Sequence, residues 1–236
     1  MNNIFERSIL IENIRQILQN FDKNTTLKKG IYIYGPPGCG KTYTIFQILE
    51  SLDYDIISYN AGDIRNHSLF NEMDSNHLSN RNVLDLMNRK QRRIAIVMDE
   101  IDGMNSGDKG GIDQLIKLIR PKKTKKQKME GTTVNPIICI GSINTDKKTR
   151  ELIKACQTFE LKPPTREQIT KVISIIMTNY STFSTDLRND ILNYIQGDLR
   201  KLFFLIKLYK NKPELMKSSI IRDVLQVKLF NEDTKN

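Results

Sequence analysis

The stretch Gly35-Pro36-Pro37-Gly38-Cys39-Gly40-Lys41-Thr42 has the form G-x-x-x-x-G-K-T. It follows the apolar run Ile31–Tyr34, which predicts a short strand, and it precedes a helical pattern of apolar residues, namely Ile45, Ile48, Leu49 and Leu52. A strand, a glycine-rich loop and a helix in this order predict a phosphate loop. Glycines let backbone N–H groups wrap around phosphate oxygens, and the N-terminus of the new helix favours negative charge.

This loop predicts a nucleoside triphosphate as ligand. We expect every residue of the stretch to line the site: Gly35, Pro36, Pro37, Gly38, Cys39, Gly40, Lys41 and Thr42. The Lys41 ammonium is placed to reach the β- and γ-phosphates, and the Thr42 hydroxyl is placed to hold Mg²⁺.

A second apolar run, Ile94–Met98, ends in the acidic pair Asp99 and Glu100. The carboxyl ends of strands in an α/β sheet are where ligands bind, so this pair is expected beside the phosphate loop. We expect Asp99 to position Mg²⁺ through its waters, because Mg²⁺ dehydrates reluctantly. Glu100 is expected to orient and deprotonate the attacking water. A polar turn after a core strand is the alternative, and the nearby phosphate loop favours the catalytic interpretation.

Two further residues are weaker candidates. Asn144 follows the apolar run Ile137–Gly141, and its neutral amide could hold the attacking water or the γ-phosphate, or simply cap the following helix. Arg200 lies in Gly197-Asp198-Leu199-Arg200 at the start of a predicted helix. It could reach over the phosphates and report nucleotide state, or be an ordinary surface arginine.

The rest of the chain predicts two domains. Five apolar runs predict strands, the last of them weakly: 31–34, 55–59, 94–98, 137–141 and 158–161. Helical patterns alternate with them, for example Ile112 to Ile119, which indicates an α/β domain with a parallel sheet sandwiched by helices. Beyond Pro163-Pro164 only helical patterns remain, at about 169–176, 187–195, 199–206 and 214–230. We therefore expect a nucleotide-binding domain over 1–162 and a small all-helical lid over 163–236.

Composition points to an intracellular protein with a polyanionic partner. The net charge is +10, and the stretch Arg120–Glu130 supplies half of it, because six cations give +6 and Glu130 leaves +5. Such a stretch favours nucleic acid, although a solvated loop explains it equally well. The three cysteines suggest a reducing compartment. We expect no membrane association, since there is no signal core at Met1 and no apolar run of about 20 residues.

Together these segments resemble an AAA+ ATPase, with Walker A, Walker B, sensor 1 and sensor 2 in order. The resemblance narrows to clamp loaders of the replication factor C type. It is carried by Ser58–Arg65, which resembles the N-A-S-D-x-R segment, and by the sensor 2 opening at 197–200. Asp99–Met104 together with Gly107–Ile112 resembles the large subunit. The resemblance implies an ATP- and Mg²⁺-dependent hydrolase in a hetero-oligomer, whose partners are other loader subunits, a sliding clamp and primer–template DNA. It also implies that Asp63 and Arg65 lie towards the DNA, and that the protein acts in the nucleus or at a cytoplasmic replication site.

The chain departs from the family pattern at two places. Lys154-Ala155-Cys156 puts alanine where small subunits carry a finger arginine, so this chain is expected to leave a neighbour's site silent. Its own site is expected to need an arginine finger from a partner subunit. Lys154 and Arg150 are possible substitutes. The resemblance also stops before a collar domain, so either partners supply one or this is a reduced, virus-type loader. The other functions considered are a structural subunit that only binds ATP, and another AAA+ DNA motor such as a helicase loader.

Overall fold

The computed structural model describes residues 4–21, 28–60, 93–106, 111–121, 124–125, 135–142, 147–217, 221 and 224–225. The chain divides into two compact units. Ile9–Pro36 and Lys41–Leu161 form one, which we call the sheet unit. The other, which we call the helical unit, draws its described residues from Met1–Ser8, Pro37–Gly40 and Lys162–Asn236.

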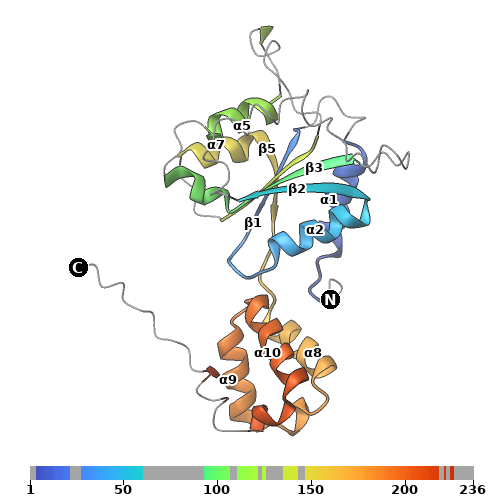
Figure 1. The fold of residues 1–236 in the computed structure, drawn as a ribbon, viewed down its shortest axis with the longest axis vertical. Coiled ribbons are helices and arrows are strands. Elements are labelled where there is room, and N and C mark those ends of the chain that lie inside the picture. Colours follow the sequence, from blue (N-terminus) through green and yellow to red (C-terminus); the bar gives the residue numbers. More distant parts are fainter. Residues whose placement is uncertain are drawn as a thin grey trace, which may run out of the picture. The chain divides into compact units, whose positions relative to one another are not determined.

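A five-stranded parallel sheet forms the centre of the sheet unit (Figure 1). Its strands are β1 (Gly30–Tyr34), β2 (Tyr54–Asn60), β3 (Arg93–Asp99), β4 (Ile137–Gly141) and β5 (Cys156–Glu160). They lie in the order β2-β3-β4-β1-β5. The predicted α/β class and parallel sheet are confirmed, and every predicted strand ends within two residues of the observed one.

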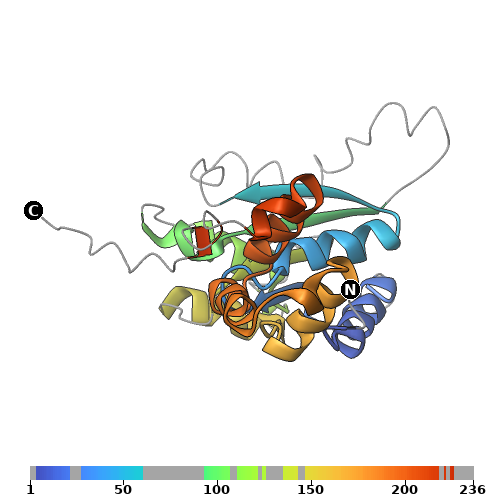
Figure 2. The same ribbon diagram turned by 90° about the horizontal axis from the view of Figure 1, so that it is seen from below.

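Helices cover both faces of this sheet. Among the described residues of this unit they are α1 (Ser8–Gln19), α2 (Lys41–Ser51), α5 (Gly111–Ile119) and α7 (Lys147–Ala155), with a short 3₁₀ turn, η2 (Ile101–Ser106), after β3. Figures 1 and 2 show α1 and α2 on one side and α5 and α7 on the other. Strand residues Tyr32, Ile96 and Cys139 pack against Leu115 of α5 and Leu152 of α7. Burial on both faces explains why the strand sequences are continuously apolar.

Within the described part of the helical unit, three helices have well-defined starts: α8 (Arg166–Ile176), α9 (Thr185–Ile195) and α10 (Leu199–Asn211). Thr165, Ser184 and Asp198 are their N-caps, and each side chain accepts a backbone N–H from the first turn. The 3₁₀ turns η3 (Tyr180–Thr182) and η4 (Pro213–Lys217) also belong to this unit. The fourth predicted helix lies largely outside the described residues beyond η4.

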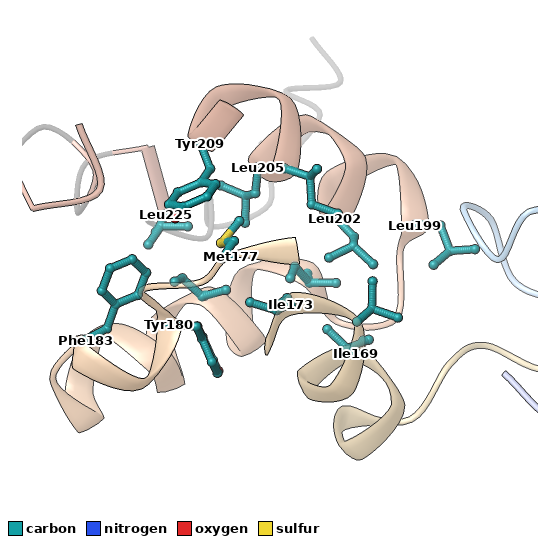
Figure 3. Packing of buried hydrophobic residues seen from close by; sticks show 14 of the residues in the cluster. Ile169, Ile173, Met177, Tyr180, Phe183, Leu199, Leu202, Leu205, Tyr209 and Leu225 are labelled. Carbon is teal, nitrogen blue, oxygen red and sulfur yellow. The ribbon is translucent and has the colours of Figure 1, made fainter. Parts of the chain in front are cut away.

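An apolar core holds these helices together, as Figure 3 shows. Ile173 of α8, Ile191 of α9 and Leu202 of α10 are completely buried in it. The same core takes in Phe5 from near the start of the chain, which is only 7% exposed. The N-terminal segment and the loop residues Pro37–Gly40, both placed in the first domain by the sequence, therefore group with the helices in the structure. No helix among the described residues is both long and apolar enough to cross a membrane.

Candidate functional site

The phosphate loop connects β1 to α2, as its sequence predicts. Lys41 opens α2, and its ammonium donates to two carbonyls of the same loop, Gly35 O at 2.9 Å and Pro36 O at 3.0 Å. The ammonium is thus folded back over the loop by neutral acceptors. Phosphate oxygens are charged acceptors and form stronger hydrogen bonds with an ammonium, so a bound phosphate would compete well for it.

The tip of the loop needs glycine for two reasons. Gly38 and Gly40 have φ of +75° and +90°, values that favour glycine over residues with a Cβ. A Cβ at Gly38 would also collide with the Asp198 carboxylate. The Gly38 carbonyl accepts the backbone N–H of Leu199 at 2.8 Å, so the start of α10 lies against the loop tip within the helical unit. Sequence reasoning quoted Asp198 only as part of a motif and missed this packing role.

Two oxygen ligands meet where α2 begins and β3 ends. The Thr42 hydroxyl donates to Asp99 Oδ2 at 2.7 Å. The other carboxylate oxygen of Asp99 accepts the backbone N–H of Glu100 at 2.9 Å, which fixes the orientation of the carboxylate. A hydroxyl and a carboxylate are hard oxygen donors of the kind that Mg²⁺ prefers, and the Asp99 charge suits a cation. These residues therefore fit a magnesium ion.

Glu100 leaves the strand in an unusual conformation. Its φ is +54°, in the left-handed region that non-glycine residues seldom adopt. Its carbonyl accepts the N–H of Gly103 at 2.9 Å, which closes a turn directly after β3. The strand alternation ends at Asp99, and the Glu100 side chain is exposed. The two acids can therefore diverge, one towards Thr42 and the other towards solvent.

A second polar cluster, which sequence reasoning missed, holds the end of β4. The Ser142 backbone N–H donates to Asp102 Oδ2 at 2.6 Å, and its carbonyl accepts the Tyr32 hydroxyl at 3.3 Å. Burial, followed by the nearby Asp102 charge, raises the pKa of Tyr32, so the phenol stays a donor. Because Asn144 comes two residues after Ser142, this cluster fixes the strand end that leads to it. Asn144 itself lies outside the described residues.

The other residues predicted to act at the site lie in the helical unit, at the end of α7, or outside the described residues. Arg200 is in the helical unit at the exposed start of α10, where its Nε lies 3.4 Å from Asp198 Oδ1 in an ion pair. Ala155 ends α7 and is buried, whereas Lys154 before it is exposed. Asp63, Arg65 and most of the Arg120–Glu130 stretch lie outside the described residues.

The fold and the sequence can now be compared with known proteins. The family "ATPase family associated with various cellular activities (AAA)" matches residues 31–194, from β1 into α9. The chain belongs to this family. The match includes the phosphate loop and the β3 acids, and it ends six residues before Arg200.

Three curated relatives extend the likeness beyond the family. The chain is 26% identical to replication factor C subunit 1 of Saccharomyces cerevisiae over 81% of its own length and 22% of that protein. It is 29% identical to the subunit 1 of Drosophila melanogaster, over 81% of this chain and 19% of that protein. Identity to the replication factor C large subunit of Thermofilum pendens is 26%, over 78% of this chain and 41% of that protein. This AAA family member thus spans about a fifth of the two eukaryotic relatives.

A solved structure supports the fold alone. The AMPPCP-bound DnaA from Aquifex aeolicus matches 92% of this chain and 66% of its own, with a TM-score of 0.56 and 16% sequence identity. This likeness concerns the fold and carries no statement about activity.

Proposed function

We propose that this chain binds ATP with Mg²⁺ and hydrolyses it as a subunit of a clamp loader, which places a sliding clamp on primer–template DNA. The observation that carries the ATPase part is the 2.7 Å hydrogen bond from Thr42 to Asp99. It joins the phosphate loop to the acidic strand end, as metal-assisted hydrolysis of a nucleotide requires. The similarity to replication factor C large subunits supports the clamp-loader part.

Each residue has one role in this proposal. Backbone N–H groups of the non-proline residues in Gly35–Thr42 cradle the phosphates, and the Lys41 ammonium bonds the β- and γ-phosphates. Thr42 and Asp99 would hold Mg²⁺, which when bound neutralises charge on the phosphate oxygens. Glu100 accepts the proton of the attacking water, and Asn144 orients that water. Arg200 would exchange its pairing with Asp198 for the γ-phosphate and so link nucleotide state to the helical unit.

The chain would work in a hetero-oligomer. Alanine at position 155 leaves it without a finger arginine, so it would offer none to a neighbour. Its own site would receive an arginine from a neighbouring subunit. An arginine finger is worth about 10³–10⁵ in rate, which makes the isolated chain a slow ATPase. ATP binding would set the angle between the two units and shape an arc of subunits around the clamp. The loader would act at an intracellular replication site, nuclear or cytoplasmic.

Affinity purification tests the assignment to a clamp loader. A tagged chain, recovered from its native cell with ATP and Mg²⁺ present, should bring down smaller AAA+ subunits and a ring-shaped clamp. Mass spectrometry of the recovered proteins is the measurement. The Lys41→Ala variant is the control, since a clamp held through ATP-dependent assembly should be lost from it. Recovery of a helicase in place of a clamp would overturn this function and favour a helicase loader.

The basic stretch Arg120–Glu130 should contribute to DNA affinity. Replacing it with a short Gly-Ser link removes six cations, and each lost phosphate contact should reduce the salt-dependence slope by about 0.9 on a log–log scale. Titration of fluorescent primer–template DNA at several salt concentrations measures this. The double variant Lys207→Ala, Lys210→Ala, which removes two exposed charges of α10, is the comparison. An unchanged affinity and slope after truncation would show that the stretch is only a solvated loop.

A further inference from the structure

Arg7 is a buried cation that no motif accounts for. The residue is only 6% exposed. Its Nη2 donates to two backbone carbonyls, Cys39 O at 2.9 Å and Lys162 O at 3.1 Å. The guanidinium carbon also lies 5.2 Å from the centroid of the Phe5 ring. Among the described residues, these contacts of Arg7 are with carbonyls and an aromatic face, and none is with a carboxylate.

The position of Arg7 is set by the core of the helical unit. Phe5 is buried in that core, and Glu6 between the two has a φ of +54°, which turns the chain sharply. An aromatic ring beneath a guanidinium attracts it and restricts its rotamers. Arg7, Cys39 and Lys162 all belong to the helical unit, so this arrangement is internal to one compact unit.

The bond to Cys39 controls the orientation of a phosphate-loop peptide. A trans peptide is planar, so its carbonyl and its N–H point in opposite directions. With the Cys39 carbonyl held by Arg7, the N–H of Gly40 must point to the other side. Gly40, at φ +90°, has no Cβ to resist rotation of this peptide, so an external bond is needed to fix it.

The preceding peptide is held in the same way. The Gly38 carbonyl accepts the N–H of Leu199 at 2.8 Å, which directs the N–H of Cys39 away from α10. Two successive carbonyls of the loop tip are therefore bound by donors of the helical unit. The N–H groups of the same two peptides therefore point away from these donors, and successive N–H groups that face one side form the concavity that binds phosphate.

We propose that Arg7 is a positioning residue of the nucleotide site: it fixes the Cys39–Gly40 peptide for phosphate binding and ties the loop tip to the Lys162 carbonyl. Lys162 directly precedes Pro163-Pro164, and the helices of the helical unit follow these prolines. The Arg7 guanidinium therefore holds both the loop tip, where nucleotide would bind, and the start of the segment that leads to those helices. This inference rests on the proposed function, because it takes nucleotide phosphates as the ligand of the loop.

Two substitutions test Arg7. Arg7→Met keeps an apolar stem over Phe5 and removes every donor, whereas Arg7→Lys keeps the charge and three donors on a shorter, less rigid head. We expect Arg7→Met to weaken ADP binding about tenfold or more, since hydrogen bonds from a charged donor are stronger than those between neutral groups. Arg7→Lys should recover part of this loss. Isothermal titration calorimetry on the full chain is the measurement.

The choice of probes separates a phosphate effect from other causes. Tripolyphosphate has no base or ribose, so Arg7→Met should weaken it by the same factor as ADP. If Arg7→Met weakens ADP binding and leaves tripolyphosphate binding unchanged, Arg7 acts at the base or sugar, which would overturn the proposal. Arg15→Ala is the matched control, because the Arg15 guanidinium donates to the exposed Ser51 hydroxyl at 3.1 Å and its loss should change neither affinity.

Failure of this inference is distinct from failure of the proposed function. If the unaltered chain binds neither ADP nor tripolyphosphate, the proposed nucleotide site is wrong. If the unaltered chain binds both and Arg7→Met binds both equally well, only the role of Arg7 is wrong. Circular dichroism melting reports whether Arg7→Met is folded. If Arg7→Met does not fold, the same comparison is made with Arg7→Lys, which must then bind both ADP and tripolyphosphate more weakly than the unaltered chain.

Discussion

The Lys41→Ala variant is expected to lose nucleotide binding. The Lys41 ammonium is held over the phosphate loop by the Gly35 and Pro36 carbonyls, and in the proposed site it exchanges these for phosphate oxygens. Truncating one partner of a desolvated charge pair costs about 2–5 kcal/mol, and about 1.4 kcal/mol corresponds to a factor of ten. ATP affinity should therefore fall about thirtyfold to several thousandfold. Equilibrium binding of labelled ATP to the isolated chain measures this without requiring turnover.

A second lysine provides the control for this variant. The Lys28 ammonium also donates to a backbone carbonyl, that of Cys156 at 3.0 Å, but at the amino end of the sheet. Lys28→Ala removes the same charge and a similar bond far from the carboxyl ends of the strands, so it should bind ATP normally. Equal binding by Lys41→Ala and the unaltered chain would remove the phosphate loop from the proposed site.

The elements that the sequence predicted well are those specified by neighbouring residues. The strand Ile94–Met98 is continuously apolar because both its faces are covered. Helix α8 begins directly after Thr165, which forms a capping box with Gln168 in the first turn of the helix. The sequence also predicted that Asp99 would lie beside the loop that contains Thr42, because the carboxyl ends of parallel strands meet at one edge of a sheet. Their 2.7 Å contact lies where that rule predicts.

The features that the sequence did not predict depend on residues far apart in the chain. Arg7 bonds to Lys162, 155 positions away, and nothing around it distinguishes a buried arginine from a surface one. The Tyr32–Ser142 contact joins two strands through a hydroxyl in an otherwise apolar run. Local periodicity carries no signal for such tertiary pairings. The grouping of Pro37–Gly40 with the helices is likewise fixed by long-range contacts, those made to Leu199 and Arg7.

The Glu100→Gln variant is expected to bind ATP normally but to hydrolyse it much more slowly. The substitution keeps the size of the side chain. Residue 100 is held by its own backbone, whose N–H donates to Asp99 Oδ1 and whose carbonyl accepts the N–H of Gly103, so the Glu100 carboxylate takes no part in these contacts. The protein would retain Lys41, Thr42 and Asp99 for binding and lose only the group that accepts a proton. General-base catalysis contributes about 10²–10⁴-fold, so hydrolysis should slow by that factor.

Single-turnover hydrolysis of radiolabelled ATP, with protein in excess and partner subunits added, detects this change even where the chain alone is slow. Glu160→Gln is the matched control, since Glu160 is also an exposed glutamate at the carboxyl end of a strand, but on edge strand β5, separated from β3 by two strands. Glu160→Gln should hydrolyse ATP at the normal rate. If Glu100→Gln does so as well, the base is another residue. If it fails to bind ATP, Glu100 supports the nucleotide site rather than the chemical step. Retained binding with slow hydrolysis is the combination expected of a general base, because Gln keeps the size of the side chain but cannot accept the proton of the attacking water.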